Sequence, residues 1–305
     1  MKPFLASFLH GLFWPFTWLE SRVASVDLLV SVFLLIAIAS ATGLIAVYLF
    51  PSSDSNNTDS ISEGEGNSDN CNALGVEIRD CIWTYRPEFA DGSSGSDFSN
   101  SCDVITSSEE VVSVIESARD DDQIKAILLE IDSTGGMPVA AEEIANALKE
   151  LGKPSIAWIR GNGDSAAYWI ASAADTIIAA ENSDVGSIGV TQSYVDNAQQ
   201  NIKKGLTFNQ LSTGLYKDTG NPDKPLSADE RTYLERDLNI ILNNFIQTVA
   251  TNRHLSVEKV TALADGSSML GAMALKNGLI DQIGTKQQVW DALERQIGEK
   301  PEVCW

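Results

Sequence analysis

Residues 155–174 read SIAWIRGNGDSAAYWIASAA, and this stretch decides the fold. Its first five residues are mostly apolar, as in a buried strand, and its last nine are small or apolar, as in a buried helix. Glycines on either side of Asn162 mark the change from one to the other. Ser165 is therefore expected at a strand–turn–helix junction, close to the unpaired N–H groups and the positive end of the helix.

A serine at such a junction has two interpretations. Serine is among the commonest helix N-cap residues, and the stretch taken alone favours that structural role for Ser165. The alternative is a nucleophile, because the helix end and the backbone N–H groups would stabilise an oxyanion developing beside the hydroxyl. The base would then not be histidine, since His10 precedes a long apolar run and His254 falls in a polar helical pattern.

The strand–turn–helix pattern recurs on both sides of this stretch. An amphipathic helix is expected to begin near Ser107, and residues 126–131 form a buried strand followed by a turn at 132–136. A second helix then runs to Lys149, and 176–179 is a further short strand. Successive units of this kind predict an α/β fold with parallel strands. Gly135, Gly136 and Ser165 would then face one cleft at the carboxyl ends of the strands, although a Gly-Gly pair also simply permits a tight turn.

Charge and cysteine usage exclude several functional classes. The net charge is −21, and residues 1–50 are neutral, so the whole charge lies after Pro51. So acidic a domain would repel phosphates, and we expect no nucleic-acid partner. We expect no metal, because the cysteines lack the paired C-x-x-C spacing of a zinc site and no cluster of carboxylates suggests another metal site. We also expect no cofactor. Four cysteines allow three disulfide connectivities, and the sequence selects none of them; they are Cys71, Cys81, Cys102 and Cys304.

The N-terminal part of the chain predicts a membrane anchor. Residues 26–50 contain an apolar run from Leu28 to Phe50 that is long enough to span a bilayer. Lys2 and Arg22 precede it, which places residues 1–25 in the cytoplasm and the rest outside. A cleaved signal peptide is the less favoured alternative, because the run is long and starts late. The aromatic segment 4–19 is expected at the membrane interface, and residues 51–72 read as a polar linker.

Residues 74–297 resemble the signal peptide peptidase A family of membrane-anchored serine peptidases. The resemblance rests on the order and spacing of several short motifs, each of them weak alone. The matching pieces are Glu130–Gly136, Lys153–Pro154, Asp164–Ala171, Ala173–Asp175, Val185–Val190, Gly214–Asp218, Ala264–Gly266 and Gly278–Gly284. The resemblance implies a Clp-protease/crotonase-like fold of repeated β-β-α units over 73–299, with 300–305 as a tail.

The family uses a Ser–Lys dyad, and both members carry over by motif. Ser165 matches the nucleophile and Lys217 the general base, a role that requires burial or neighbouring charges to lower a lysine pKa. Ser187 corresponds to a serine that positions the lysine. The oxyanion hole would use backbone N–H groups of Gly135 or Gly136 and of Ala166.

Three places in the sequence depart from the family pattern. Thr134 stands where proline is common, and residues 267–270 differ from the usual run after Asp-Gly. Asp164 stands beside the nucleophile where a small residue is usual. A buried negative charge there would favour a protonated lysine, so we expect the Asp164 side chain to point to solvent.

These features predict a serine endopeptidase in the cell membrane, with its catalytic domain outside the cytoplasm. The family implies remnant signal peptides or other membrane-associated polypeptides as substrates. The chain resembles a half-length form, which implies a homo-oligomeric ring whose subunits share active sites. Two alternatives remain: an inactive scaffold that binds membrane peptides, and a crotonase-type thioester enzyme, since that fold also has a two-amide oxyanion hole.

Overall fold

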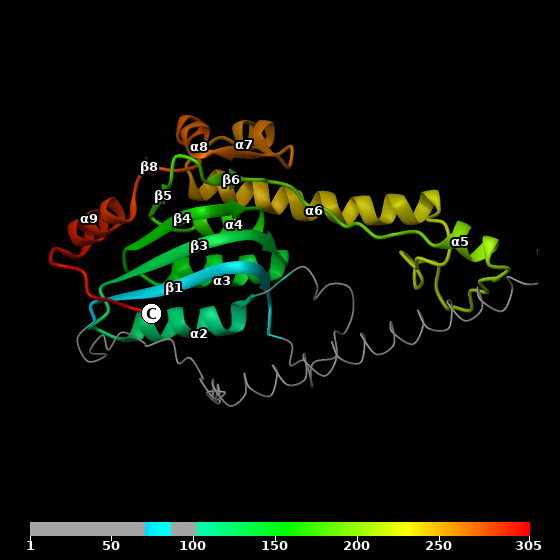
Figure 1. Cartoon of the computed structure of the whole chain (residues 1–305), viewed down its shortest axis with the longest axis horizontal. Coiled ribbons are helices and arrows are strands. Elements are labelled where there is room, and N and C mark those ends of the chain that lie inside the picture. The colour runs from blue at the N-terminus through cyan, green and yellow to red at the C-terminus, as the bar shows by residue number, and fades with distance from the viewer. Residues whose placement is uncertain (1–70, 87–101, 103) are drawn as a thin grey trace, which may run out of the picture. The chain divides into compact units, whose positions relative to one another are not determined.

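The computed structural model of the chain describes residues 71–86, 102 and 104–305 (Figure 1). The expected cytoplasmic segment, the expected span at 26–50 and nearly all of the expected linker lie outside those residues. Among the described residues, no helix combines the length and the apolar character needed to cross a bilayer.

A largely parallel sheet forms the centre of the described region. Its strands follow the order β2-β1-β3-β4-β5-β8, with β6 beside β4, β7 beside β6 and β9 beside β1. Among the described strands, β6 and β7 form the one antiparallel pair. The bounds are β1 (Ala73–Trp83), β2 (Ile105–Ser107), β3 (Ala126–Gly136), β4 (Ser155–Asp164), β5 (Thr176–Ala179), β6 (Asp184–Gly186), β7 (Ser268–Leu270), β8 (Gln282–Ile283) and β9 (Val303–Cys304).

Helices cover both faces of this sheet because β3 and β4 are apolar on both sides. Ile127 and Leu129 belong to the larger buried cluster, shared with α2, α3 and α4, whereas Leu128 belongs to a smaller cluster shared with α9. The α/β class with parallel strands is therefore confirmed. The helices are α2 (Ser108–Asp120), α3 (Pro138–Glu150), α4 (Ala166–Ser172), α5 (Ala198–Lys203), α6 (Ala228–Asn252), α7 (Val257–Leu263), α8 (Gly271–Asn277) and α9 (Lys286–Ile297).

Local signals explain where the helices begin. The Ser107 hydroxyl accepts a hydrogen bond from the N–H of Glu110 and caps α2, as expected. Pro138 stands in the first turn of α3, where its missing N–H costs nothing. At the start of α6, Ser227 and Glu230 bond each other's backbone N–H groups in a capping box.

Two strands run further than the sequence predicts. The expected turn at 132–136 is wrong, because β3 stays extended to Gly136 and pairs Gly135 and Gly136 with β1. Likewise, β4 continues past Ile159 and pairs Asn162–Asp164 with β6. Glycine in a strand pattern predicts that the strand ends there. In β3 and β4 the neighbouring strands supply hydrogen-bonding partners that the local sequence does not reveal.

Two disulfides resolve the open cysteine connectivity. Cys71 is joined to Cys304 across a sequence separation of 233 residues, and Cys81 is joined to Cys102. Beside the first of them, Val303 and Cys304 pair with Ala73 and Leu74 as β9. The two ends of the domain are therefore held together covalently and by sheet pairing.

Residues 192–227, which we call the Lys217 segment, lead from β6 to the start of α6 and include α5. Figure 1 shows α6 running from the region of α4 away from the sheet towards α5. Near its C-terminal end Phe245 stacks on Trp169 of α4, with ring centroids 4.7 Å apart. Near its N-terminal end Tyr233 stacks on Tyr216 of the Lys217 segment at 4.8 Å.

Candidate active site

Ser165 occupies the turn between β4 and α4, in a strained backbone conformation. Its φ is 53°, a region that residues other than glycine seldom adopt. The Ser165 N–H donates to the carbonyl of Gly186 at 2.8 Å, which fixes the turn. Ser165 is the N-cap residue of α4 by position, yet its side chain makes no capping hydrogen bond. The hydroxyl is therefore not used in the role that the local sequence favoured.

Gly135 and Gly136 lie directly against this turn. A Cβ added to Gly135, whose φ is +113°, would stand 2.8 Å from Cβ of Ser165 and 3.0 Å from the nitrogen of Ala166. The Gly135 N–H donates to Oγ of Ser133 at 3.1 Å, so that N–H is already engaged. At Gly136 an added Cβ would collide with the backbone of Ile82.

The geometry separates the candidate oxyanion donors. The N–H of Met137 points to β1 and donates to Ile82. Successive residues of an extended strand point to opposite sides, so the Gly136 N–H points away from β1. Gly136 lines the same cleft as Ser165 and Ala166, and the Ala166 N–H lies in the first turn of α4, where helical N–H groups lack partners. Gly136 and Ala166 are thus better placed than Gly135 to hold an oxyanion.

The cleft has a volume of about 490 Å³. Gly136, Ser165 and Ala166 line one part of it, and apolar side chains line another. Ser187 lines it in another strained conformation, with φ 47°, and its hydroxyl donates to the carbonyl of Gly266 at 3.0 Å. The apolar wall comes from α4, α6 and the chain after β6. Its members are Trp169, Val190, Ile241, Leu242 and Phe245. No sequence signal indicates this wall, because α6 lies about 80 residues beyond Ser165 and contacts α4 only through packing in the folded chain.

Lys217 does not lie in this cleft within one chain. It is exposed, and it is next to Tyr216, which stacks on Tyr233. Tyr233 precedes Phe245 by about 12 residues of α6, which is about 18 Å along the helix axis. The structure of one chain therefore brings together Ser165, Ala166, Gly136 and Ser187 and leaves Lys217 apart from them. His254 is also exposed, in the turn after α6 rather than in a helix.

The expectation that Asp164 points to solvent is wrong for one of its oxygens. Oδ1 of Asp164 is buried and has no hydrogen-bond partner among the described residues. Burial raises the pKa of the Asp164 carboxyl to about 6, and the nearby charge of Asp184 acts in the same direction. Pairing of β4 with β6 places these two carboxyls on one face, a proximity that a strand register decides.

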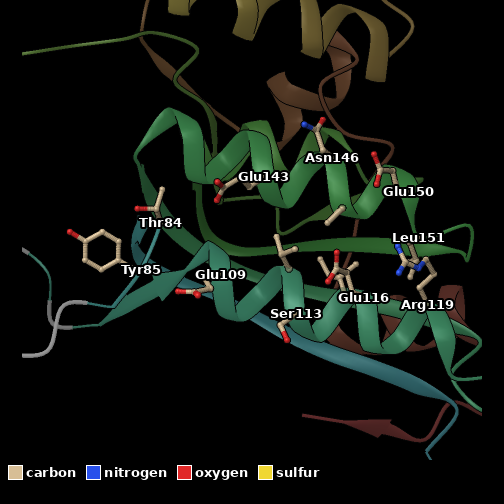
Figure 2. A pocket seen from close by; sticks show the side chains of 13 residues that line it. Thr84, Tyr85, Glu109, Ser113, Glu116, Arg119, Glu143, Asn146, Glu150 and Leu151 are labelled. Atoms are coloured by element: carbon tan, nitrogen blue, oxygen red, sulfur yellow. The ribbon is translucent and has the colours of Figure 1, made fainter.

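A cavity larger than the cleft of Ser165 lies elsewhere. It measures about 780 Å³ and lies between α2 and α3 (Figure 2). Glu109 and Glu116 line it from α2, and Glu143 and Glu150 line it from α3. It shares no lining residue with the cleft of Ser165. Its lining carries these carboxylates beside apolar side chains such as Val112 and Ile115, and Ser165 lies outside it, so size alone does not identify the candidate site.

Candidate metal ligands come together in one place among the described residues. Asp80, Cys81 and Cys102 lie within ligand distance of one another. Cys81 and Cys102 are joined in a disulfide, so neither offers the thiolate that a metal requires.

A strained serine between a parallel strand and a helix, with glycine backbone beside it, defines the class: an α/β protein whose candidate site lies at a strand-to-helix turn. Residues 147–299 match the family model described as peptidase family S49. The chain belongs to this family, and the resemblance to signal peptide peptidase A proteins is confirmed.

Named relatives agree with this assignment. A putative protease of Methanocaldococcus jannaschii is 34% identical over 195 residues, which cover 63% of each chain. Protease 4 of Haemophilus influenzae is 30% identical over 198 residues, 64% of this chain and 32% of the relative. A putative signal peptide peptidase of Enterococcus faecium is 30% identical over 185 residues, 60% of this chain and 54% of the relative. The match thus spans less than two thirds of each relative.

Proposed function

We propose that this chain is a membrane-anchored serine endopeptidase that acts outside the cytoplasm on remnant signal peptides or other membrane-associated polypeptides. One observation carries the proposal. The Ser165 hydroxyl is free of its expected capping role and opens on a cleft beside Gly136 and Ala166. Membership of peptidase family S49 supports the same reaction class.

In the proposed reaction, Oγ of Ser165 attacks the peptide carbonyl carbon while neutral Lys217 accepts the hydroxyl proton. The N–H groups of Gly136 and Ala166 bind the negative oxygen of the tetrahedral intermediate. Lysine then returns its proton to the leaving amine, and water hydrolyses the acyl-enzyme. Ser187 would hold the lysine amine in position, exchanging its present bond to Gly266. No metal or cofactor takes part.

The apolar wall of the cleft supports the proposed substrate class. Trp169 and Phe245 stack there, and Leu242 lines the same side. A substrate side chain that is itself apolar gains free energy by leaving water against such a wall. Signal peptides and membrane-associated segments are rich in these side chains.

The exposed surface of the Lys217 segment supports assembly into a ring. Leu211 is 97% exposed, Val195 78%, Leu215 72% and Ile202 65%. Large apolar side chains gathered on one segment are typical of a protein interface. A head-to-tail contact repeated around a closed ring would bring Lys217 of one subunit to Ser165 of the next.

The two disulfides support the proposed compartment, because such bonds persist in oxidising surroundings. The anchor at 26–50 and the interfacial segment before it complete the proposed topology. Reporter fusions after Ser52 should be active outside the cytoplasm, and fusions before Arg22 inside it. The opposite pattern would exclude this compartment.

The central experiment combines two inactive variants of the full-length chain. Ser165→Ala and Lys217→Ala should each abolish cleavage of casein or a signal peptide, whereas Lys204→Ala, an exposed lysine of the same segment, should not. Co-expression of the two inactive chains should restore about a quarter of the wild-type sites. A chain that carries both changes should only dilute wild-type activity.

Labelling identifies the nucleophile independently. A fluorophosphonate probe should modify Ser165 in the assembled protein, and chelators should not affect the rate. If mixed oligomers form but recover no activity, Lys217 does not act between subunits. If Ser165→Ala cleaves as fast as wild type, Ser165 is not the nucleophile. If the wild-type chain binds these peptides without cleaving them, the peptide-binding scaffold becomes the better function.

A further inference from the structure

Asp164 is a carboxyl that the proposed mechanism does not use, although it precedes the nucleophile. Its strand pairs with β6 in the register Asn162 with Asp184 and Asp164 with Gly186. The next N–H, that of Ser165, donates to the carbonyl of the same Gly186. Asp164 is therefore held at the base of the turn and cannot move away without breaking strand pairing.

Oδ1 of Asp164 is buried without a hydrogen-bond partner, which is rare for a carboxylate oxygen. Alternate residues of a strand share a face, so Asn162, Asp164 and the facing Asp184 lie on one side of the β4–β6 pair. Asp184 accepts a long hydrogen bond from Ser268 of β7, at 3.4 Å, and no described cation forms an ion pair with it. The carboxyl of Asp164 thus has a like charge as its neighbour, which together with burial raises its pKa to about 6.

The other charged groups around the turn do not compensate Asp164. On β3, Asp132 accepts hydrogen bonds from the backbone and side chain of Asn162. On β4, Arg160 is bonded to Glu130 at 2.6 Å. Among the described residues, no cation forms an ion pair with Asp164.

Two further groups complete the charges to be considered. In the turn that lines the cleft opposite Ser165, Asp265 is exposed and accepts bonds from Ser267. In the Lys217 segment, Asp218 follows the lysine and lies 4.0 Å from Lys224. Neither places a positive charge beside Asp164, so among the described residues no ion pair offsets the charge that directly precedes Ser165 in the chain.

We propose that Asp164 is a positioning residue that sets the pH range of the reaction: its carboxylate holds the base approaching Ser165 in the protonated form and opposes negative charge on the substrate oxygen. This inference rests on the proposed function, because it acts through the lysine base. A nearby negative charge raises the pKa of a lysine, and a base that must lose a proton then works only at higher pH. The chain should therefore cleave peptides in an alkaline range.

The test measures kcat/KM against pH for the full-length oligomer with Asp164→Asn, which keeps the shape and removes the charge. The acid limb of the profile should move to lower pH by about one unit, the low end of the roughly 1–3 units by which a neighbouring charge shifts a pKa. At a pH below both limbs, kcat/KM should rise about tenfold, mainly through kcat. Asp164→Ala should move the limb equally, since the effect comes from charge and not from the amide.

Two matched variants separate charge from structure. Asp184→Asn should move the limb in the same direction by less, because Asp184 is one strand further from Ser165. Asp265→Asn removes a solvated carboxylate on the cleft and should move the limb by less than about 0.3 unit. If Asp164→Asn folds and cleaves but its limb stays within about 0.3 unit of wild type, or if it loses activity at every pH, the inference is wrong.

Failure of this inference is distinguishable from failure of the proposed function. If cleavage requires Ser165 but the acid limb of the kcat/KM profile does not move in the Asp164 variants, the inference about Asp164 is wrong and the proposed function stands. Wild-type cleavage that is indifferent to Ser165→Ala overturns both.

Discussion

The end of the sheet around Ser165 and the Lys217 segment are built in opposite ways. Around Ser165, strand pairing and buried side chains hold every element, and Ala166, Tyr168 and Trp169 are almost completely buried. In the Lys217 segment, α5 is short, and Leu211 and Leu215 stand in solvent. One chain therefore preorganises the proposed nucleophile and its proposed backbone donors, whereas the segment with the proposed base presents a surface that a partner would cover.

The covalent closure of the domain gives the largest expected effect. Replacing Cys71 and Cys304 with serine should lower the free energy of unfolding by about 5 kcal/mol, because the bond closes a loop of 233 residues. Replacing Cys81 and Cys102, which lie 21 residues apart, should cost about 3 kcal/mol. Denaturant unfolding of the oxidised proteins measures both. Equal losses for the two pairs would show that the stabilisation does not depend on the length of the loop that each disulfide closes.

Gly135→Ala should affect catalysis next most strongly. The new methyl group would meet Ser165 and Ala166, and φ of +113° is unfavourable for alanine. Displacing the nucleophile and a donor should lower kcat/KM about a thousandfold, or about 4 kcal/mol. Gly205→Ala is the control: it also has positive φ but has open space around it, in the Lys217 segment. If Gly135→Ala keeps full activity, as Gly205→Ala should, the backbone around Ser165 can shift to make room for the methyl group and the contrast between the two regions is wrong.

Charges on the Lys217 segment should separate subunits without unfolding them. Leu211→Asp combined with Leu215→Asp should lower activity about a hundredfold, or about 3 kcal/mol, and should shift the protein towards monomers in sedimentation. Met273→Asp, at a similarly exposed position on α8, should do neither. A fully active monomer would contradict the contrast between the two regions.

The smallest effect concerns two carboxyls, Asp164 at the sheet end and Glu230 in the first turn of α6, directly after the Lys217 segment. The pKa of Asp164 is raised from 3.8 to about 6, so its favourable contribution to folding is present at low pH and is lost as pH rises through 6. The shift corresponds to at most about 3 kcal/mol, and we expect about 1 kcal/mol because the residue is only partly buried. Asp164→Asn should therefore be more stable than wild type at pH 8 and converge with it below about pH 4.

Glu230, at the start of α6, provides the opposite case. A hydrogen bond from Lys224, and then the bond from the Ser227 N–H, lower the pKa of Glu230 to about 2. Its contribution is present above pH 4.5 and is lost as pH falls towards 2. Glu230→Gln should therefore destabilise the protein at pH 7 and match wild type near pH 2 in thermal unfolding. Parallel pH profiles for the two variants would contradict these assignments.

Much of this protein follows from its sequence because the signals are local. The apolar strand at 155–159, the cap at Ser107 and the place of Ser165 between strand and helix all depend on residues within about a dozen positions. The motif order was sufficient to identify the family, since it preserves spacing along the chain. The number of cysteines likewise limited their pairing to three possibilities.

Other properties depended on contacts that no local window contains. Only the folded chain joined Cys71 to Cys304, set Asp184 beside Asp164 and brought α6 against Trp169. Only the turn geometry showed that the Ser165 hydroxyl caps nothing and that the Gly135 N–H is engaged by Ser133. Strand register and helix packing decide these features, because they join residues dozens to hundreds of positions apart, where periodicity carries no information.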